Sequence, residues 1–173
     1  MEGPMQTNTL PRYDDSVNPT GCCPRFDPTD WDGRTLVFED KPFLRATTRS
    51  VMHIPVDMGR VFSRVQAKIE AEDAYDPDDY IVLSRDLSPW KGEHLFAVPR
   101  PVPGEEMVTL TGRYLTRVFE GPYRNAPHWI ETLRDIAKAK GATRDETWVF
   151  YTTCPKCARA YGRNYVVGLV RID

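Results

Sequence analysis

The residues best suited to chemistry are four cysteines, which fall into two pairs. Cys22-Cys23 lies near the start of the chain, and Cys154-Pro155-Lys156-Cys157 lies near its end. Proteins hold zinc with three or four soft ligands in tetrahedral geometry, and a Cys-Pro-x-Cys turn is typical of one half of such a site. The sequence therefore predicts a structural zinc site formed by Cys22, Cys23, Cys154 and Cys157.

Two other interpretations of these cysteines stay open. Residues 149–158 locally resemble a glutaredoxin active site, where a strand leads into a Cys-Pro-x-Cys turn at the start of a helix. Against redox catalysis, Gly162 interrupts the segment soon after the motif, and only one strand is predicted beyond it. In the third interpretation, free thiols pack a loop against the N-terminal segment.

A second group of residues could carry acid–base chemistry. Glu120 ends a predicted strand just before Gly121-Pro122, where a partly buried carboxylate can act as a general acid or base. His53 has nearly the same place in the first half of the chain, so the sequence predicts that it faces Glu120, with Tyr123 close by. The simpler alternatives are a solvated strand-end Glu120 and a structural His53.

Aromatic side chains are candidates to line a ligand groove, because their rings offer apolar contact together with a polar group. Trp129 and Tyr151 could equally belong to the core. The predicted ligand-binding residues are Trp90, Tyr123, Trp129, Tyr151, Tyr161 and Tyr165.

Periodicity places these residues on secondary structure. A strand is expected over residues 115–119 and a helix from Asn125, with apolar residues recurring at the spacing of a helix that lies on a sheet. Gly141 is placed to end that helix in a left-handed conformation. The pattern repeats at an offset of 68 residues, from Thr48 to Thr116 and from position 58 to position 126.

These patterns predict an α+β fold. Two pseudo-symmetric strand–helix–strand–strand repeats, at about residues 34–101 and 107–173, would form an antiparallel sheet with two helices on one face and a groove between the halves. Residues 1–20 lack periodicity and are expected to be a disordered tail before a single domain at 21–173.

Tandem units with a Phe119-Glu120-Gly121-Pro122-Tyr123 junction resemble the GyrI-like (SOUL-type) small-molecule-binding superfamily, a domain type of bacterial regulators. The resemblance covers about residues 34–173. It implies a ligand groove between the repeats, and it also implies hydrolysis, since some members open reactive cyclopropane-containing natural products. The chain departs from the pattern at residues 148–151, where many members carry an acidic residue and this chain has none.

The composition of the chain limits which classes of partner we expect. With 23 basic and 25 acidic residues the net charge is −2, which gives no basic footprint for nucleic acid, and no apolar run approaches a membrane span. We expect a cytoplasmic protein, monomeric or weakly dimeric, with a small-molecule partner and no membrane partner. Three functions follow: binding of a largely apolar or aromatic molecule in the groove, hydrolysis of a reactive small molecule there, or thiol and metal handling by the cysteines.

Overall fold

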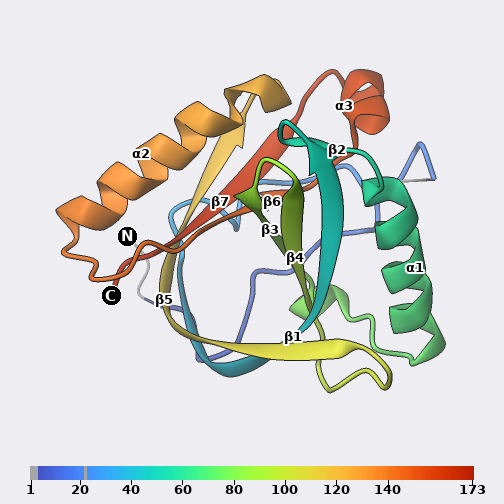
Figure 1. Ribbon diagram of the computed structural model, residues 1–173, viewed down its shortest axis with the longest axis horizontal. Helices are drawn as coiled ribbons and strands as arrows, with labels where there is room; N and C mark the ends of the chain where they lie inside the picture. The colour runs from blue at the N-terminus through green and yellow to red at the C-terminus, as the bar shows by residue number, and fades with distance from the viewer. Residues whose placement is uncertain (1–3, 22) are drawn as a thin grey trace.

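The computed structural model describes residues 4–21 and 23–173, and its main feature is one closed sheet with helices outside it (Figure 1). In chain order the elements are β1 (Thr35–Val51), β2 (Ile54–Pro55), α1 (Met58–Ala71), the 3-10 turn η1 (Pro77–Asp79), β3 (Val82–Ser88), β4 (Lys91–Ala97), β5 (Glu106–Glu120), the 3-10 turn η2 (Tyr123–Asn125), α2 (Ala126–Ala139), β6 (Thr147–Tyr151), α3 (Pro155–Tyr161) and β7 (Tyr165–Arg171).

Six strands form the closed sheet in the order β1-β4-β3-β6-β7-β5, and β5 pairs back to β1. All of these pairings are antiparallel. The short β2 pairs only with the end of β1. Closure leaves the six strands without the free edges that an open sheet would have.

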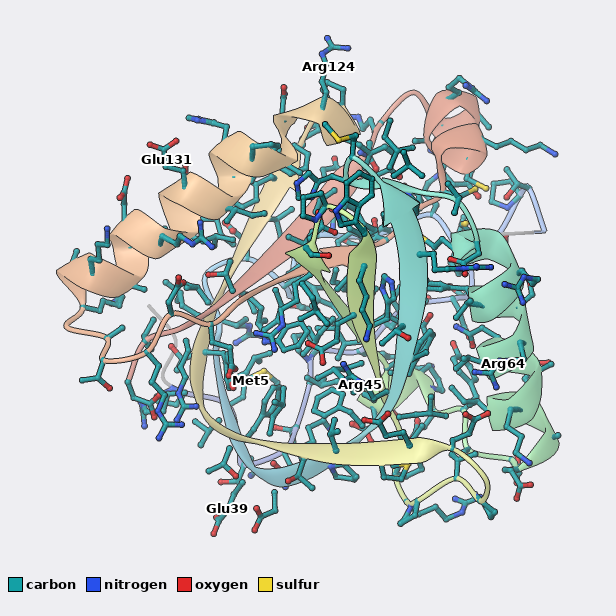
Figure 2. All side chains as sticks on the ribbon, viewed as in Figure 1. Met5, Glu39, Arg45, Arg64, Arg124 and Glu131 are labelled. Atoms are coloured by element: carbon teal, nitrogen blue, oxygen red, sulfur yellow. The ribbon has the colours of Figure 1, made fainter. Side chains whose placement is uncertain are left out.

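The predicted α+β class and the antiparallel sheet are confirmed, but the helices do not share one face of an open sheet. Instead α1 packs on β1, and α2 packs on β7 and β6, so the two helices cover different parts of the barrel's outside (Figure 1). Figure 2 shows Glu131 on α2 projecting away from the barrel. Arg64 on α1 instead pairs with Glu105, directly before β5, with Nη1 2.6 Å from Oε1. Because the sheet curves and closes on itself, helices on strands as far apart as β1 and β7 lie at different places around the barrel.

Each helix buries a single stripe, as its sequence predicts. In α1 the buried residues are Val61, Val65 and Ile69, and in α2 they are Trp129, Leu133 and Ala137, in both cases four residues apart. Asn125 stands at the N-cap of α2, although its side chain makes no capping hydrogen bond. Gly141 follows α2 with φ of 80°, the left-handed conformation predicted for it.

The order strand–helix–strand–strand occurs twice along the chain, as β1-α1-β3-β4 and β5-α2-β6-β7. Both helices are 14 residues long, and they begin at residues 58 and 126, the offset found in the sequence. That a pseudo-two-fold axis relates the two halves stays a prediction.

The described part of the N-terminal segment packs on the barrel rather than extending as the expected tail. The Met5 and Asn8 amides donate to the carbonyls of Thr35 and Val37, at 3.0 and 2.7 Å. Leu10 and Tyr13 are buried. The apolar residues of this segment have no regular spacing, so the sequence pattern could not predict that they are buried. They cover the sheet face opposite α2.

Phe150 marks the centre of that contact. Its neighbour Val149 packs beneath α2, so strand alternation turns Phe150 to the other face of the sheet. There its ring lies 5.6 Å from that of Trp31 and 6.0 Å from that of Tyr13, between centroids. The N-terminal segment therefore fills part of the space expected to be a groove.

Candidate functional site

Three of the four cysteines gather where the N-terminal segment meets α3. The Sγ atoms of Cys23, Cys154 and Cys157 all lie within 4.8 Å of one another. None of the three is in a disulfide, and Cys157 is buried. The fourth predicted ligand, Cys22, lies outside the described residues.

The local sequence explains how the three thiols converge. Cys154 is the N-cap of α3 and Cys157 lies in its first turn, so a spacing of three residues brings both to one side of the helix. Hydrogen bonds tie the N-terminal segment to this turn: the Cys154 amide donates to Cys23 Sγ at 3.4 Å, and the Tyr161 hydroxyl donates to the Cys23 carbonyl at 2.5 Å.

This arrangement fits a metal ion. Tetrahedral thiolates at a metal–sulfur distance of ~2.3 Å are separated by roughly 3.8 Å, which is compatible with three sulfurs that all lie within 4.8 Å of one another. Thr20 Oγ1 forms a 3.3 Å hydrogen bond with Cys157 Sγ, and this bond, together with contacts from Cys154 and Cys23, lowers the pKa of Cys157 to about 7. A thiol so favoured as a thiolate is ready to ligate a metal. The three cysteines could therefore bind a metal ion.

Two cavities lie beside the cysteines, and both have a wall made by the N-terminal segment. The first cavity, of about 410 Å³, is lined by Pro28, Thr29, Asp32, Val118, Phe119, Glu120 and Tyr165. The second, of about 370 Å³, is lined by Asp14, Val17, Arg25, Phe26, Asp27, Pro28, Thr152, Thr153, Tyr161, Arg163 and Tyr165. Pro28 and Tyr165 line both, so the cavities are neighbours.

Glu120 lies at the first cavity with a cation and a second carboxylate. Its Oε1 atom is 3.9 Å from Arg163 Nη1, and its side chain is 51 % exposed, so water reaches it. Arg163 Nη1 also donates to the Tyr165 hydroxyl at 2.8 Å. Asp32 is held in place because its Oδ1 atom accepts from the Val118 amide at 2.8 Å. The site thus combines a solvated carboxylate, a guanidinium and a phenol.

The predicted His53–Glu120 pair is not formed. His53 lies at the β1–β2 turn, where its Nδ1 atom is 2.7 Å from Asp86 Oδ2. Glu120 pairs with Arg163 instead, and among the described residues no hydrogen bond or ion pair joins it to His53. The two positions match in the repeat pattern, but the partner of His53 comes from β3.

The sequence of this chain matches one family. The model of a family described as "Bacterial hydrolase" matches residues 13–172. The chain belongs to this bacterial hydrolase family. No curated protein matches the sequence. The matched range of the chain includes every residue that lines the two cavities and all three clustered cysteines.

The predicted aromatic ligand residues divide into three groups. Tyr161 and Tyr165 line the cavities. Tyr123 and Tyr151 contact each other, with ring centroids 5.5 Å apart, and the Tyr123 hydroxyl donates to the Thr153 carbonyl. Trp129 is buried and stacks on Phe119 at 5.5 Å, as its core alternative requires, whereas Trp90 is exposed at the β3–β4 turn.

His94 is hydrogen-bonded to two hydroxyl side chains, and its role is structural. Its Nε2 atom is 2.8 Å from Thr48 Oγ1, and its Nδ1 atom is 2.7 Å from Ser84 Oγ, so both ring nitrogens are satisfied in the interior. Burial lowers the pKa of His94 to about 4, which keeps the ring neutral at pH 7.

Sequence reasoning missed Asp32 and Arg163 as residues of this candidate site. Asp32 lies in a Trp-Asp-Gly stretch that reads as an ordinary turn, and Arg163 lies in the loop before β7. No local pattern distinguishes them, because their place beside Glu120 depends on how distant segments pack.

In the part of the chain that the structure describes, no helix has the length and apolar character needed to cross a membrane.

Proposed function

We propose that this protein hydrolyses a small electrophilic molecule bound in the two neighbouring cavities, with Glu120 as the general base. Membership of the bacterial hydrolase family supports the reaction class. The observation that carries the site is the presence of Glu120 and Asp32 on the wall of one cavity, with Arg163 beside Glu120. The hydrolase alternative is thus preferred to binding alone.

The proposed step uses water as the nucleophile. Glu120 takes a proton from a water molecule while the water oxygen bonds to the electrophilic atom of the substrate. The bond to the leaving group then breaks, and the leaving group takes the proton back from Glu120. A positioned carboxylate accelerates such a transfer by about 10²–10⁴-fold.

The other residues have supporting roles in this proposal. The guanidinium of Arg163 stabilises negative charge that develops on the substrate, and it orients the Tyr165 hydroxyl, to which it donates. Val118 and Phe119 offer apolar contact in the first cavity, and Tyr161 and Arg25 line the second. This mixed lining fits a molecule with an apolar body and one polar or anionic group.

We assign structural zinc to Cys23, Cys154 and Cys157. Three soft thiolates favour zinc, and their combined charge of −3 exceeds the +2 of the ion, which lowers its power to activate water and suits a stabilising role. Its proposed task is to fasten the N-terminal segment, which forms one wall of both cavities, to α3. Catalysis would then rest on the cavity residues, while the metal keeps their wall in position.

The relation to the GyrI-like superfamily also stays part of the proposal. It is supported by the repeated strand–helix–strand–strand order and by the equal offset of the two helices. In this relation, β5 is the long strand of the second repeat, and Glu120 is its last residue.

The test is a hydrolysis screen with aryl esters, lactones, epoxides and strained-ring compounds, followed by Glu120→Gln. Glu131→Gln is the matched control, because Glu131 is exposed on the outer side of α2 (Figure 2). We expect Glu120→Gln to lower kcat/KM by about 10²–10⁴-fold and Glu131→Gln to leave it unchanged.

Equal activity of the two variants would remove Glu120 from the mechanism. If compounds bind without turnover, and Glu120→Gln changes only their affinity, the protein is a ligand-binding member of its family and the hydrolytic proposal fails.

A further inference from the structure

One end of the barrel exposes an unusual amount of apolar surface. Residues 51–56 are six consecutive exposed residues at the β1–β2 turn, and four of them are Val51, Met52, Ile54 and Val56, each more than half exposed. The β3–β4 turn adds Leu87 and Trp90, at 44 and 57 %. Isolated exposed apolar residues are common, but such a concentration indicates an interaction site.

The two turns form one surface, which we call the apolar tip (residues 51–56 and 87–90). The Ser50 amide donates to the Trp90 carbonyl, and the His53 amide donates to the Pro89 carbonyl, both at 2.8 Å. His53 Nδ1 also bonds to Asp86 Oδ2 at 2.7 Å. These bonds fix both turns side by side, at the end of the barrel where Figure 1 shows β2.

The backbone of the apolar tip is strained. Met52 and His53 have φ of 50° and 69°, the left-handed region that side chains with a Cβ atom rarely adopt. Met52 is 67 % exposed, so core packing does not require its apolar side chain there. Strain that no folding contact explains is often kept for function.

Cations surround the apolar tip. Arg49 on β1 stands directly opposite Lys91 on β4, and like charges in this position destabilise a sheet. Arg49 and Arg60 are 79 and 71 % exposed, and both pair with Asp57, which is only 11 % exposed. Asp86 is a half-exposed carboxylate at this rim, so the outward charges, Arg49, Arg60 and Lys91 against Asp86, are mainly positive, although the whole chain has a net charge of −2.

We propose that the apolar tip inserts into an anionic lipid surface, with Arg49, Arg60 and Lys91 contacting the headgroups. Protruding aliphatic residues and a tryptophan suit the boundary between headgroups and acyl chains, and basic residues around them favour anionic lipids. Two copies of the chain would bring their cationic rims together, which disfavours self-association through the same surface. The sequence predicted no membrane partner because no segment could span a bilayer, but a peripheral contact needs no such segment.

Tryptophan fluorescence tests this contact directly. Of the four tryptophans, all of them among the described residues, Trp31, Trp129 and Trp148 are buried and only Trp90 is exposed. We expect vesicles of phosphatidylcholine mixed with phosphatidylserine to shift the emission to the blue and to sediment the protein. Vesicles of phosphatidylcholine alone should have a much weaker effect, and added salt should weaken binding to the mixed vesicles.

Variants locate the surface. The double variant Met52→Ser/Ile54→Ser should lower the vesicle partition coefficient by about tenfold or more, because two large apolar side chains are lost from the contact. Lys91→Glu should also lower it, whereas Lys138→Glu, an exposed lysine on α2, should not. These residues line neither cavity, so hydrolysis of a soluble substrate by the Met52→Ser/Ile54→Ser variant should stay unchanged.

Absence of both the blue shift and sedimentation would overturn the proposal. So would an Ile54-dependent dimer, detected by light scattering, that does not bind vesicles, because the apolar tip would then join two copies of the chain. Neither result would touch the hydrolytic proposal, which is tested by Glu120→Gln.

Discussion

The chain passes twice from a long strand into a 14-residue helix, at residues 52–57 between β1 and α1 and at residues 121–125 between β5 and α2. The second junction is anchored by its surroundings. The Gly121 amide donates to the Asn164 carbonyl at 3.1 Å, and Asn164 Nδ2 donates back to the Gly121 carbonyl at 2.8 Å. Tyr123 adds a hydrogen bond to the Thr153 carbonyl.

The first junction is also held by hydrogen bonds, from His53 to Pro89 of the β3–β4 turn and to Asp86 of β3, but its side chains and backbone differ. Its apolar side chains face solvent, and two of its residues, Met52 and His53, are left-handed without being glycine. In the second junction the one such position is a glycine, Gly121, with φ of 145°. The second junction therefore has a backbone that suits its residues and hydrogen bonds that fix it beside the candidate site. The first junction has Met52 and His53 in a conformation that their side chains disfavour.

The strands that enter the junctions are also fixed differently. Thr48, near the end of β1, bonds to the buried His94 of the neighbouring strand. Thr116, its counterpart in β5, donates to the carbonyl of Trp31 and accepts from the Arg34 amide. One threonine therefore stabilises the barrel wall, and the other holds the N-terminal segment that forms the cavities.

The largest effect on stability should come from changes to the cysteines. Cys154 follows directly after Thr153, whose carbonyl accepts the hydrogen bond from Tyr123 that anchors the second junction. We expect Cys154→Ser, or removal of metal by a chelator, to lower the free energy of unfolding by about 3 kcal/mol or more, and hydrolysis to fall with it. Urea unfolding with elemental analysis checks this. Cys154→Ser protein with unchanged stability, or purified protein without metal, would refute a structural zinc.

The cysteine cluster also shows what the sequence could and could not predict. The motif Cys-Pro-x-Cys at the start of α3 is local, so the approach of Cys154 to Cys157 was predictable, and so was the buried stripe of α2. The meeting of Cys23 with Cys154 spans most of the chain, and the pairing of β1 with β5 that closes the barrel is equally non-local. Neither leaves a periodic trace in the sequence.

The same limit explains the mistaken partner of His53. An offset between repeats predicts where a residue lies along its own strand. It does not predict which other strand supplies the partner of its side chain. Asp86 belongs to β3, and the β3–β4 turn carries it beside the β1–β2 turn. The place of Glu120 at the end of β5 could be predicted, because a strand end before Gly-Pro is a local feature.

The second prediction concerns how the free energy of unfolding depends on pH through the buried His94. His94 has a folded-state pKa of about 4 against about 6.5 when unfolded, because burial disfavours its charged form. The unfolded chain therefore takes up the proton first. Stability is fully present above pH ~6.5 and is lost as the pH falls towards ~4, by about 3 kcal/mol.

Urea unfolding at a series of pH values measures this loss. His94→Gln, which has no titrating group, should show a shallower decline over the same range, although it is less stable at pH 7. Parallel curves for the two proteins would mean that His94 is not the group that titrates.

A smaller effect is expected at Gly121. A Cβ atom there would lie 3.3 Å from Asn125 Nδ2, and the φ of 145° is unfavourable for alanine. Gly121→Ala should therefore lower the free energy of unfolding by about 1–3 kcal/mol. Gly59→Ala is the matched control, since its Cβ would meet nothing within 4 Å and alanine favours the helix by roughly 0.5–1 kcal/mol. Similar effects of the two changes would show that the second junction is not rigidly anchored.

The smallest effect should appear at Met52, the left-handed residue of the first junction. Met52→Gly relieves a strain of roughly 1–2 kcal/mol but adds freedom to the unfolded chain worth about 0.4–1 kcal/mol, so we expect a net gain of about 0.5 kcal/mol. Met52→Asn should gain a similar amount, because asparagine tolerates this conformation. Both variants should bind anionic vesicles less well than the natural protein. A gain in stability together with a loss of binding would mean that the strain is kept for the contact at the apolar tip, whereas a loss of stability would place Met52 among the residues that the fold itself requires.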